Sequence, residues 1–173
     1  NMRTIRREKC NNCAQCALAC PARAIELVGQ YLAVEAVMET VMRDLSYYRR
    51  TRGGLTVSGG EPLAQWRFAK ALLREARRRG LHTALDTTGY ADWAVFSDVV
   101  RFADLVLYDI KHVDGGLHLD ATGVTNDRIL ENLRKTMERR APLRAADTNN
   151  DNQPDLYYHV VRKYRDSFLP AIT

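Results

Sequence analysis

The chain has 173 residues, 46% hydrophobic and 27% charged, enough for one domain with its own core and a small appendage. No apolar stretch approaches the roughly 18 residues of a membrane-spanning helix, and no signal-peptide pattern opens the chain, so we expect a soluble, cytoplasmic protein. The net charge is +5, but the arginines gather near the ends of predicted helices, where they complement the helix dipole; we therefore expect neither nucleic acid nor a membrane as a partner.

The cysteines of the chain all lie in one segment near its start: Cys10, Cys13, Cys16 and Cys20. Their spacing, C-x2-C-x2-C-x3-C-P, is that of bacterial ferredoxins, in which the thiolates hold iron–sulfur clusters. Disulfides are a poor alternative in a chain of cytosolic character, and zinc sites usually separate two CxxC pairs by about a dozen residues or more. The run predicts a ferredoxin-like 4Fe-4S segment over residues 1–28.

Helices and strands alternate through the middle of the chain. A short strand is expected at 24–28 and an amphipathic helix over 32–48, where apolar residues recur every three or four positions. Three strand–turn–helix units follow, with strands expected at 55–58, 81–85 and 104–108, and helices at 64–79, 91–101 and 126–140. This alternation indicates an α/β fold with a parallel sheet.

Each of these strands ends in a turn that carries charged or backbone-exposing residues, namely GGEP, DTTG and DIKH. Right-handed crossovers place the turns on one edge of the sheet, which is the edge where βα folds bind ligands. Alone, Lys111 would be a surface lysine and Asp86 a helix N-cap, but the three strand ends together favour a ligand site. His112 and His118 are expected to be structural or surface histidines.

The chain after residue 143 differs in character. It is polar as far as residue 155, and a last helix is expected over 156–168. Four of its side chains have the spacing of a calcium-binding loop: Asp147, Asn149, Asp151 and Asp155. The glycine and the final glutamate of such a loop are absent, so a surface loop is the better interpretation. We expect three regions: 1–28, 29–143 and a divergent tail, 144–173.

The cysteine run, followed by GGLTVSGGEPLAQ, LHTALDTTGY, DLVLYDIKH and TGVTNDRILENL, resembles the glycyl-radical enzyme activating proteins, including the pyruvate formate-lyase activating enzymes. The resemblance covers residues 9–143 and implies a radical S-adenosylmethionine (SAM) oxidoreductase built on a partial (β/α) barrel. In that family a reduced 4Fe-4S cluster donates an electron to SAM, and the resulting 5′-deoxyadenosyl radical takes a hydrogen atom from a glycine of a partner enzyme. The implied partners are a glycyl-radical enzyme of the formate acetyltransferase type and an electron donor such as flavodoxin or ferredoxin.

By position, the resemblance implies a SAM-binding set at the strand ends: Gly59, Gly60, Glu61, Asp86, Thr87, Asp109 and Lys111. Exposed carbonyls of the paired glycines would accept from the SAM ammonium group, and Glu61 would orient that group or brace the turn. Lys111 would pair with the SAM carboxylate as a point charge. In the family, the positions of Asp86, Thr87 and Asp109 also lie near a monovalent-cation site. The implied cluster ligands are the four cysteines, and no side chain is assigned as catalytic.

The chain departs from the family pattern in two places. The radical-SAM signature C-x3-C-x2-C, which precedes the ferredoxin-like insert in the family, is absent, and the polar tail stands where the family continues with further barrel strands. The chain therefore resembles a fragment that begins inside the insert, and we expect it to be inactive alone in SAM cleavage.

Two questions stay open from the sequence. The fourth cysteine of such a run binds the other cluster in two-cluster ferredoxins, so either all four thiols close on one cluster or Cys20 belongs to a second site and neither site is complete. The alternative function is an electron-transfer or interaction module that uses no SAM. A third interpretation is a structural domain with vestigial metal sites.

Overall fold

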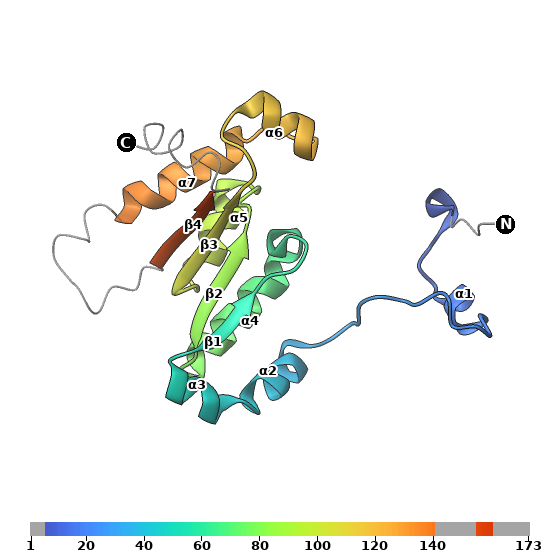
Figure 1. The fold of residues 1–173 in the computed structure, drawn as a ribbon. Coiled ribbons are helices and arrows are strands. Elements are labelled where there is room, and N and C mark those ends of the chain that lie inside the picture. Colours follow the sequence, from blue (N-terminus) through green and yellow to red (C-terminus); the bar gives the residue numbers. More distant parts are fainter. Residues whose placement is uncertain (1–5, 141–154, 161–173) are drawn as a thin grey trace. The chain divides into compact units, whose positions relative to one another are not determined.

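The computed structural model describes residues 6–140 and 155–160 (Figure 1). The chain divides into two compact units, residues 1–32 and 33–173, and each is treated by itself. No helix in the described ranges is long and apolar enough to cross a membrane.

The first unit carries the cysteines and has little regular structure. It contains a 3-10 turn, η1 (Arg7–Lys9), and one short helix, α1 (Gln15–Leu18). Three non-glycine residues here adopt left-handed backbone conformations: Asn12, Ala14 and Arg23. The strand expected at 24–28 is wrong, because this stretch is irregular. A strand needs neighbouring strands to pair its backbone groups, and the described part of this unit offers none.

The helix expected over 32–48 is two helices, α2 (Val34–Met42) and α3 (Leu45–Thr51). The break falls where the amides of Arg43 and Asp44 bond carbonyls three residues back, which tightens and ends α2, while the Asp44 carbonyl starts α3. The predicted apolar face is confirmed: Met38 is fully buried in a cluster with Leu72, Ala76 and Leu81.

The second unit is built on one parallel sheet with the strand order β1-β2-β3-β4. The strands are β1 (Gly54–Val57), β2 (His82–Thr87), β3 (Leu105–Ile110) and β4 (Asp155–Val160). The first three confirm the strands predicted from the sequence, and the α/β fold class is confirmed with them. Consecutive parallel strands that lie side by side in sequence order are the arrangement found in a (β/α) barrel.

The fourth strand corrects the helix expected over 156–168. The described residues 155–160 pair along β3 in parallel register, from Leu105 opposite Asp155 to Ile110 opposite Val160. This stretch, DLYYHV, is rich in aromatic and β-branched residues, which favour a strand once a sheet edge is present to receive it. The remainder of the expected helix and residues 147–154 of the calcium-like stretch lie outside the described residues.

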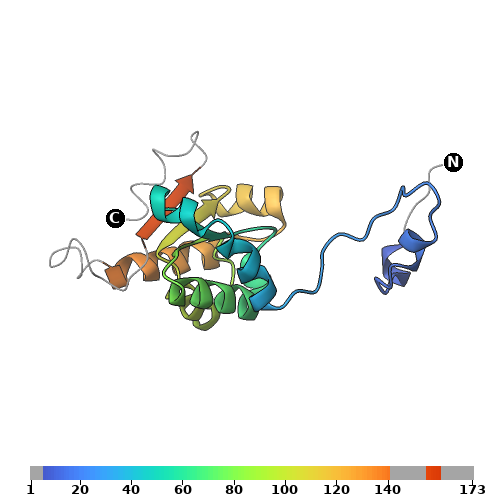
Figure 2. The ribbon, with the colours of Figure 1, turned by 90° about the horizontal axis from the view of Figure 1, so that it is seen from below.

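The helices between the strands cover one face of the sheet (Figures 1 and 2). They are α4 (Trp66–Arg78), which follows the 3-10 turn η2 (Pro62–Gln65), then α5 (Trp93–Val100) and α7 (Asp127–Arg140). Their predicted apolar stripes are confirmed, with Leu73, Phe96 and Leu133 buried against the inward residues of β2 and β3. One further helix, α6 (Gly115–Thr122), was not expected, because paired glycines open it and it has no apolar periodicity.

The arginines near the end of α4 lie where the sequence placed them. Arg78 and Arg79 both bond the Glu75 carboxylate, at 2.7 and 2.8 Å. These two guanidinium groups hold the pKa of Glu75 at about 2. Arg78 and Arg79 are thus engaged in ion pairs with a side chain of α4.

Candidate functional site

The turns after β1, β2 and β3 meet at one edge of the sheet, because the three strands are parallel neighbours (Figure 1). In the first turn, Gly59 adopts a φ of +132°, a conformation that favours glycine. Gly59 and Gly60 are exposed, and a side-chain carbon added to either would meet no atom within 4 Å. A ligand can therefore approach the backbone of this turn closely.

Glu61 fastens the first turn to the second. One carboxylate oxygen accepts from the Leu63 amide at 3.0 Å and from the Thr87 hydroxyl at 2.6 Å. The other accepts from the amide and the hydroxyl of Thr88, at 2.9 and 2.6 Å. Both oxygens are thus engaged by the chain itself, so of the two roles expected for Glu61 the geometry shows bracing of the turn.

Thr87 lies beneath the second turn. Its side chain is 3% exposed, and its hydroxyl donates to Glu61 and accepts from the Gly89 amide at 3.0 Å. A hydroxyl held between two partners at this depth shapes the turn from within. Thr87 therefore stabilises the second turn through its buried hydroxyl group.

Asp86 and Asp109 lie on the opposite face of the sheet from the helices. Side chains alternate along a strand, and Leu85 and Tyr108 point into the helix-covered core. Asp86 pairs with Leu107 in the register, two residues before Asp109, so both carboxylates project from the same face near the strand ends. Both are half-buried. The structure thus brings together the two carboxylates that the sequence placed at this edge.

Lys111 follows β3 and forms an ion pair with Asp109. Its side chain is 54% exposed, whereas that of Asp109 is 31% exposed. An ammonium group held by a single, partly solvated carboxylate at an open edge can exchange that partner for the carboxylate of a ligand.

The two histidines of this region have structural contacts. His118 is 2% exposed, and its Nδ1 lies 2.8 Å from the carbonyl of Val124. The Nδ1 of His112 accepts from the Asp114 amide at 2.9 Å and so helps to form the turn after β3. The expectation that both are structural or surface residues is confirmed.

Tyr108 and Gly89 fix the floor of the second turn. The Tyr108 hydroxyl donates to the carbonyl of Ile129 at 2.8 Å, and burial, together with the nearby charge of Glu61, raises the pKa of Tyr108. Gly89 has a φ of +71°, and a side-chain carbon there would stand 1.9 Å from the Tyr108 hydroxyl oxygen. The turn therefore requires glycine on both conformational and steric grounds.

Two residues near the start of α7 hold these turns and were not identified from the sequence. Asn132 donates to the carbonyls of Gly89 and Ala91, and Asn126 donates to those of His112 and Val113. Both side chains are 2% exposed. A signal was present: both fall on the apolar face of the predicted helix, where a polar residue needs buried partners.

The cysteines lie in the other unit. Cys10, Cys13 and Cys16 are exposed and Cys20 is half-buried. Among the described residues no group of three or more His, Cys, Asp or Glu side chains is positioned to hold a metal ion. The donor chemistry nevertheless fits an iron–sulfur cluster, since thiolates at this spacing are its usual ligands.

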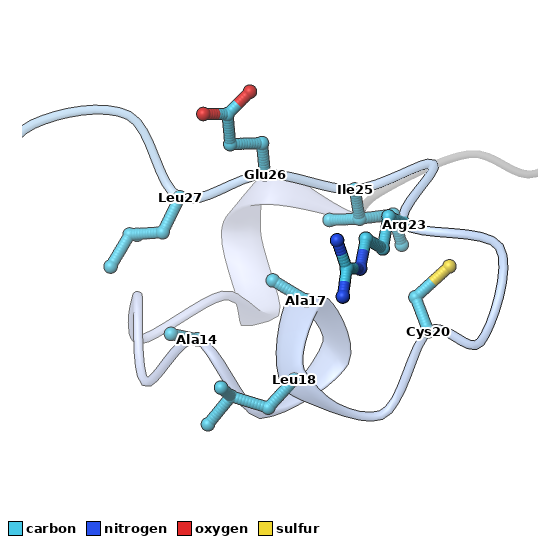
Figure 3. A pocket seen from close by; sticks show the side chains of 8 residues that line it. All are labelled: Ala14, Ala17, Leu18, Cys20, Arg23, Ile25, Glu26 and Leu27. Atoms are coloured by element: carbon cyan, nitrogen blue, oxygen red, sulfur yellow. The ribbon is translucent and has the colours of Figure 1, made fainter.

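A cleft of about 600 Å³ lies beside Cys20 (Figure 3). The apolar part of its lining comes from α1, the residue before it and the irregular stretch after it: Ala14, Ala17, Leu18, Ile25 and Leu27. Arg23 and Glu26 complete it, and Cys20 is the cysteine among its lining residues. The cleft therefore brings one thiol, rather than the set of four, to its wall.

A parallel α/β sheet with a polar turn edge, joined to a ferredoxin-like cysteine segment, defines an iron–sulfur protein of the α/β class. A family model described as "4Fe-4S single cluster domain" matches residues 7–128. The isethionate sulfite-lyase activating enzyme of Nitratidesulfovibrio vulgaris is 50% identical over 132 residues, covering 76% of this chain and 43% of that protein. The (2S)-3-sulfopropanediol dehydratase activating enzyme of Klebsiella oxytoca is 44% identical over 138 residues, covering 79% and 44%.

The chain belongs to the glycyl-radical enzyme activating family, as the sequence resemblance predicted. The pyruvate formate-lyase 2-activating enzyme of Escherichia coli is 37% identical over 137 residues, covering 77% of this chain and 47% of that protein. Among solved structures, a domain of pyruvate-formate lyase-activating enzyme from Bacteroides vulgatus matches with 37% identity and a TM-score of 0.47, over 50% of this chain and 54% of that one. The cofactors predicted from the resemblance, a 4Fe-4S cluster and SAM, are those of this family. The chain spans less than half the length of the curated relatives described above.

Proposed function

We propose that this chain supplies part of the SAM site and a cluster-binding segment of a cytoplasmic activating enzyme, which generates a glycyl radical on a partner enzyme. One observation carries the proposal: the exposed Gly59-Gly60 backbone, fixed by Glu61, shares the sheet edge with Asp86 and the Asp109–Lys111 pair. An electron carrier that uses no SAM has no need of such an edge, so the arrangement disfavours the alternative of a simple electron-transfer module.

The proposed roles follow from charge and exposure. Carbonyls of Gly59 and Gly60 would accept from the SAM ammonium group, while Lys111 would exchange Asp109 for the SAM carboxylate. Bound SAM supplies a sulfonium carbon–sulfur bond that a reduced 4Fe-4S cluster can cleave. The residues of this chain hold and orient SAM, and we expect no SAM cleavage by the chain alone.

Calorimetric titration with SAM tests the proposal. The unaltered chain should bind SAM, and Lys111→Gln should weaken binding about tenfold or more, because it removes a charge-assisted contact. Lys9→Gln removes the same charge from the exposed surface of the other unit and should leave the affinity unchanged. Absence of binding by the unaltered chain would contradict the proposal and favour the electron-transfer alternative. Equal affinity for Lys111→Gln would remove Lys111 from the site.

The cysteine segment is proposed to bind iron and sulfide through Cys10, Cys13, Cys16 and Cys20. Anaerobic reconstitution followed by iron and sulfide analysis should give less than one intact 4Fe-4S cluster per chain, because the fourth cysteine of such a run binds the companion cluster in two-cluster ferredoxins. Cys13→Ser should lower the iron content further. A full cluster per chain would show that all four thiols close on one site, and absence of bound iron would contradict the proposed ligands.

The order of sequence identities bears on the partner. Activating enzymes named for isethionate sulfite-lyase or (2S)-3-sulfopropanediol enzymes are 42–50% identical to this chain. Those named for choline trimethylamine-lyase, trans-4-hydroxy-L-proline dehydratase and pyruvate formate-lyase 2 are 35–38% identical. We therefore propose a partner closer to the first group than to formate acetyltransferase, with flavodoxin or ferredoxin as the electron donor.

A further inference from the structure

The inward face of α7 carries more polar side chains than a core face usually does. Asn126, Asn132 and Thr136 are 2%, 2% and 6% exposed, and they alternate with the buried Ile129 and Leu133. Burial of an amide is costly unless its hydrogen bonds are made inside the protein. The hydrogen-bond partners of these three side chains therefore indicate the role of this polar face.

Both asparagines donate hydrogen bonds from their side-chain amides to turns at the edge of the sheet. The Nδ2 of Asn132 donates to the carbonyls of Gly89 and Ala91, each at 2.8 Å. The Nδ2 of Asn126 donates to the carbonyls of His112 and Val113, at 2.8 and 2.7 Å. An amide NH₂ has two donors, so both donors of each asparagine are engaged by one turn. Thr136 differs, because its hydroxyl donates to the Asn132 carbonyl of its own helix at 2.7 Å.

These contacts join the three turns into one frame. Glu61 fastens the first turn to the second, Asn132 fastens the second to α7, and Asn126 fastens α7 to the third. The two asparagines are six positions apart, which corresponds to about 9 Å along a helix. A rigid helix thus sets the spacing between the turn that follows Asp86 and the turn that contains Lys111.

We propose that Asn126 and Asn132 are positioning residues, which hold the second and third turns at the separation that SAM binding requires. The inference rests on the proposed SAM site and adds the part of the fold that sets its geometry. Both asparagines are buried, so the proposed role is to hold the turns and not to contact the ligand.

Hydrogen exchange measured by mass spectrometry tests the frame without any ligand. Asn132→Ala should speed exchange about tenfold or more in a peptide covering residues 88–91, and Asn126→Ala should do so in one covering 111–114. Exchange in β2 and β3 should stay slow in both variants. Thr136→Val is the matched control: it alters the same buried face of α7 without removing a contact to a turn. Faster exchange throughout the sheet, or an equal effect of Thr136→Val, would overturn the inference.

SAM titration of the same variants separates this inference from the proposed function. Asn126→Ala and Asn132→Ala should each weaken SAM binding about tenfold, and Thr136→Val should leave it unchanged. If the unaltered chain binds SAM and both asparagine variants bind it equally well, the inference fails and the proposed function stands. If the unaltered chain binds no SAM, the proposed function fails with the ligand part of the inference, and local exchange then decides whether α7 holds the turns.

Discussion

Replacement of Gly54 by alanine should lower the free energy of unfolding by at least about 3 kcal/mol, because it forces β1 away from β2. A side-chain carbon at this position would stand 1.9 Å from the carbonyl oxygen of His82 and under 3 Å from its carbonyl carbon and amide nitrogen. All three are backbone atoms in the partner strand, which pairs Gly54 with His82 in the register. Neither strand can yield by a rotamer change. Urea denaturation followed by circular dichroism measures the loss.

Two neighbouring glycines provide controls for Gly54→Ala. Gly60→Ala adds a carbon where no atom lies within 4 Å, so its effect should stay within about 0.5 kcal/mol. Gly53→Ala meets the Thr51 hydroxyl oxygen at 3.1 Å, a side-chain contact and not a backbone one, and should cost less than Gly54→Ala. If the alanine variants at 53, 54 and 60 unfold at the same urea concentration, the close approach of β1 and β2 is contradicted.

The repeated strand–turn–helix units were predictable because local pattern and tertiary packing agree in them. The helices show apolar residues every three or four positions, and the strands are short apolar runs bounded by glycine or charged turns. Leu73, Phe96 and Leu133 lie in the core as their positions predicted. The apolar periodicity predicts these helices correctly because the same residues form the hydrophobic core.

The secondary-structure predictions were wrong where the local sequence pattern and the tertiary contacts favour different structures. Residues 24–28 have strand composition, but a strand is a property of pairing, and this unit shows no partner in its described residues. Residues 156–160 were assigned to a helix over 156–168, but their aromatic and β-branched composition suits a strand, and they form β4 along the edge of β3. The break between α2 and α3 contains no glycine or proline, so there was no signal for it in the sequence.

At the candidate site, the sequence predicted which residues lie at the same edge of the sheet, but it did not predict the hydrogen bonds that hold the turns in place. Parallel strands bring the turns together, so Gly59, Asp86 and Lys111 could be placed at one edge from topology alone. The partners of a buried amide cannot be read from spacing, because Asn132 and the carbonyls it binds at Gly89 and Ala91 are over forty positions apart along the chain.

For the cysteine segment, too, the sequence predicts the ligand residues but not their arrangement in space. Spacing identifies thiolates as iron–sulfur ligands, and membership of the family supports that assignment. The described residues of this unit include no buried side chain, so no apolar core holds the thiols in place. Metal binding itself commonly organises such small segments, and their ligand geometry is then set by the cluster.

Replacement of Glu61 by glutamine should lower the free energy of unfolding by about 2 kcal/mol and abolish measurable SAM binding. The glutamine amide must place its NH₂ group where one carboxylate oxygen stood. In either orientation it then faces a backbone amide, that of Leu63 or that of Thr88, which loses its acceptor. The hydroxyls of Thr87 and Thr88 can turn to compensate, but a backbone N–H cannot. Urea denaturation and SAM calorimetry on the same preparation measure both effects.

The pairing of the two measurements decides what Glu61 does. Glu138→Gln, on the exposed side of α7 and paired with Arg134 of the same helix, controls for loss of a carboxylate and should change neither measurement. Joint loss of stability and affinity for Glu61→Gln supports bracing, because the same hydrogen bonds that stabilise the fold hold the two turns in register. Loss of affinity with wild-type stability would instead mean that Glu61 meets the ligand directly. Wild-type values in both would show that the turns keep their spacing without it, leaving α7 as the part of the frame that sets the site.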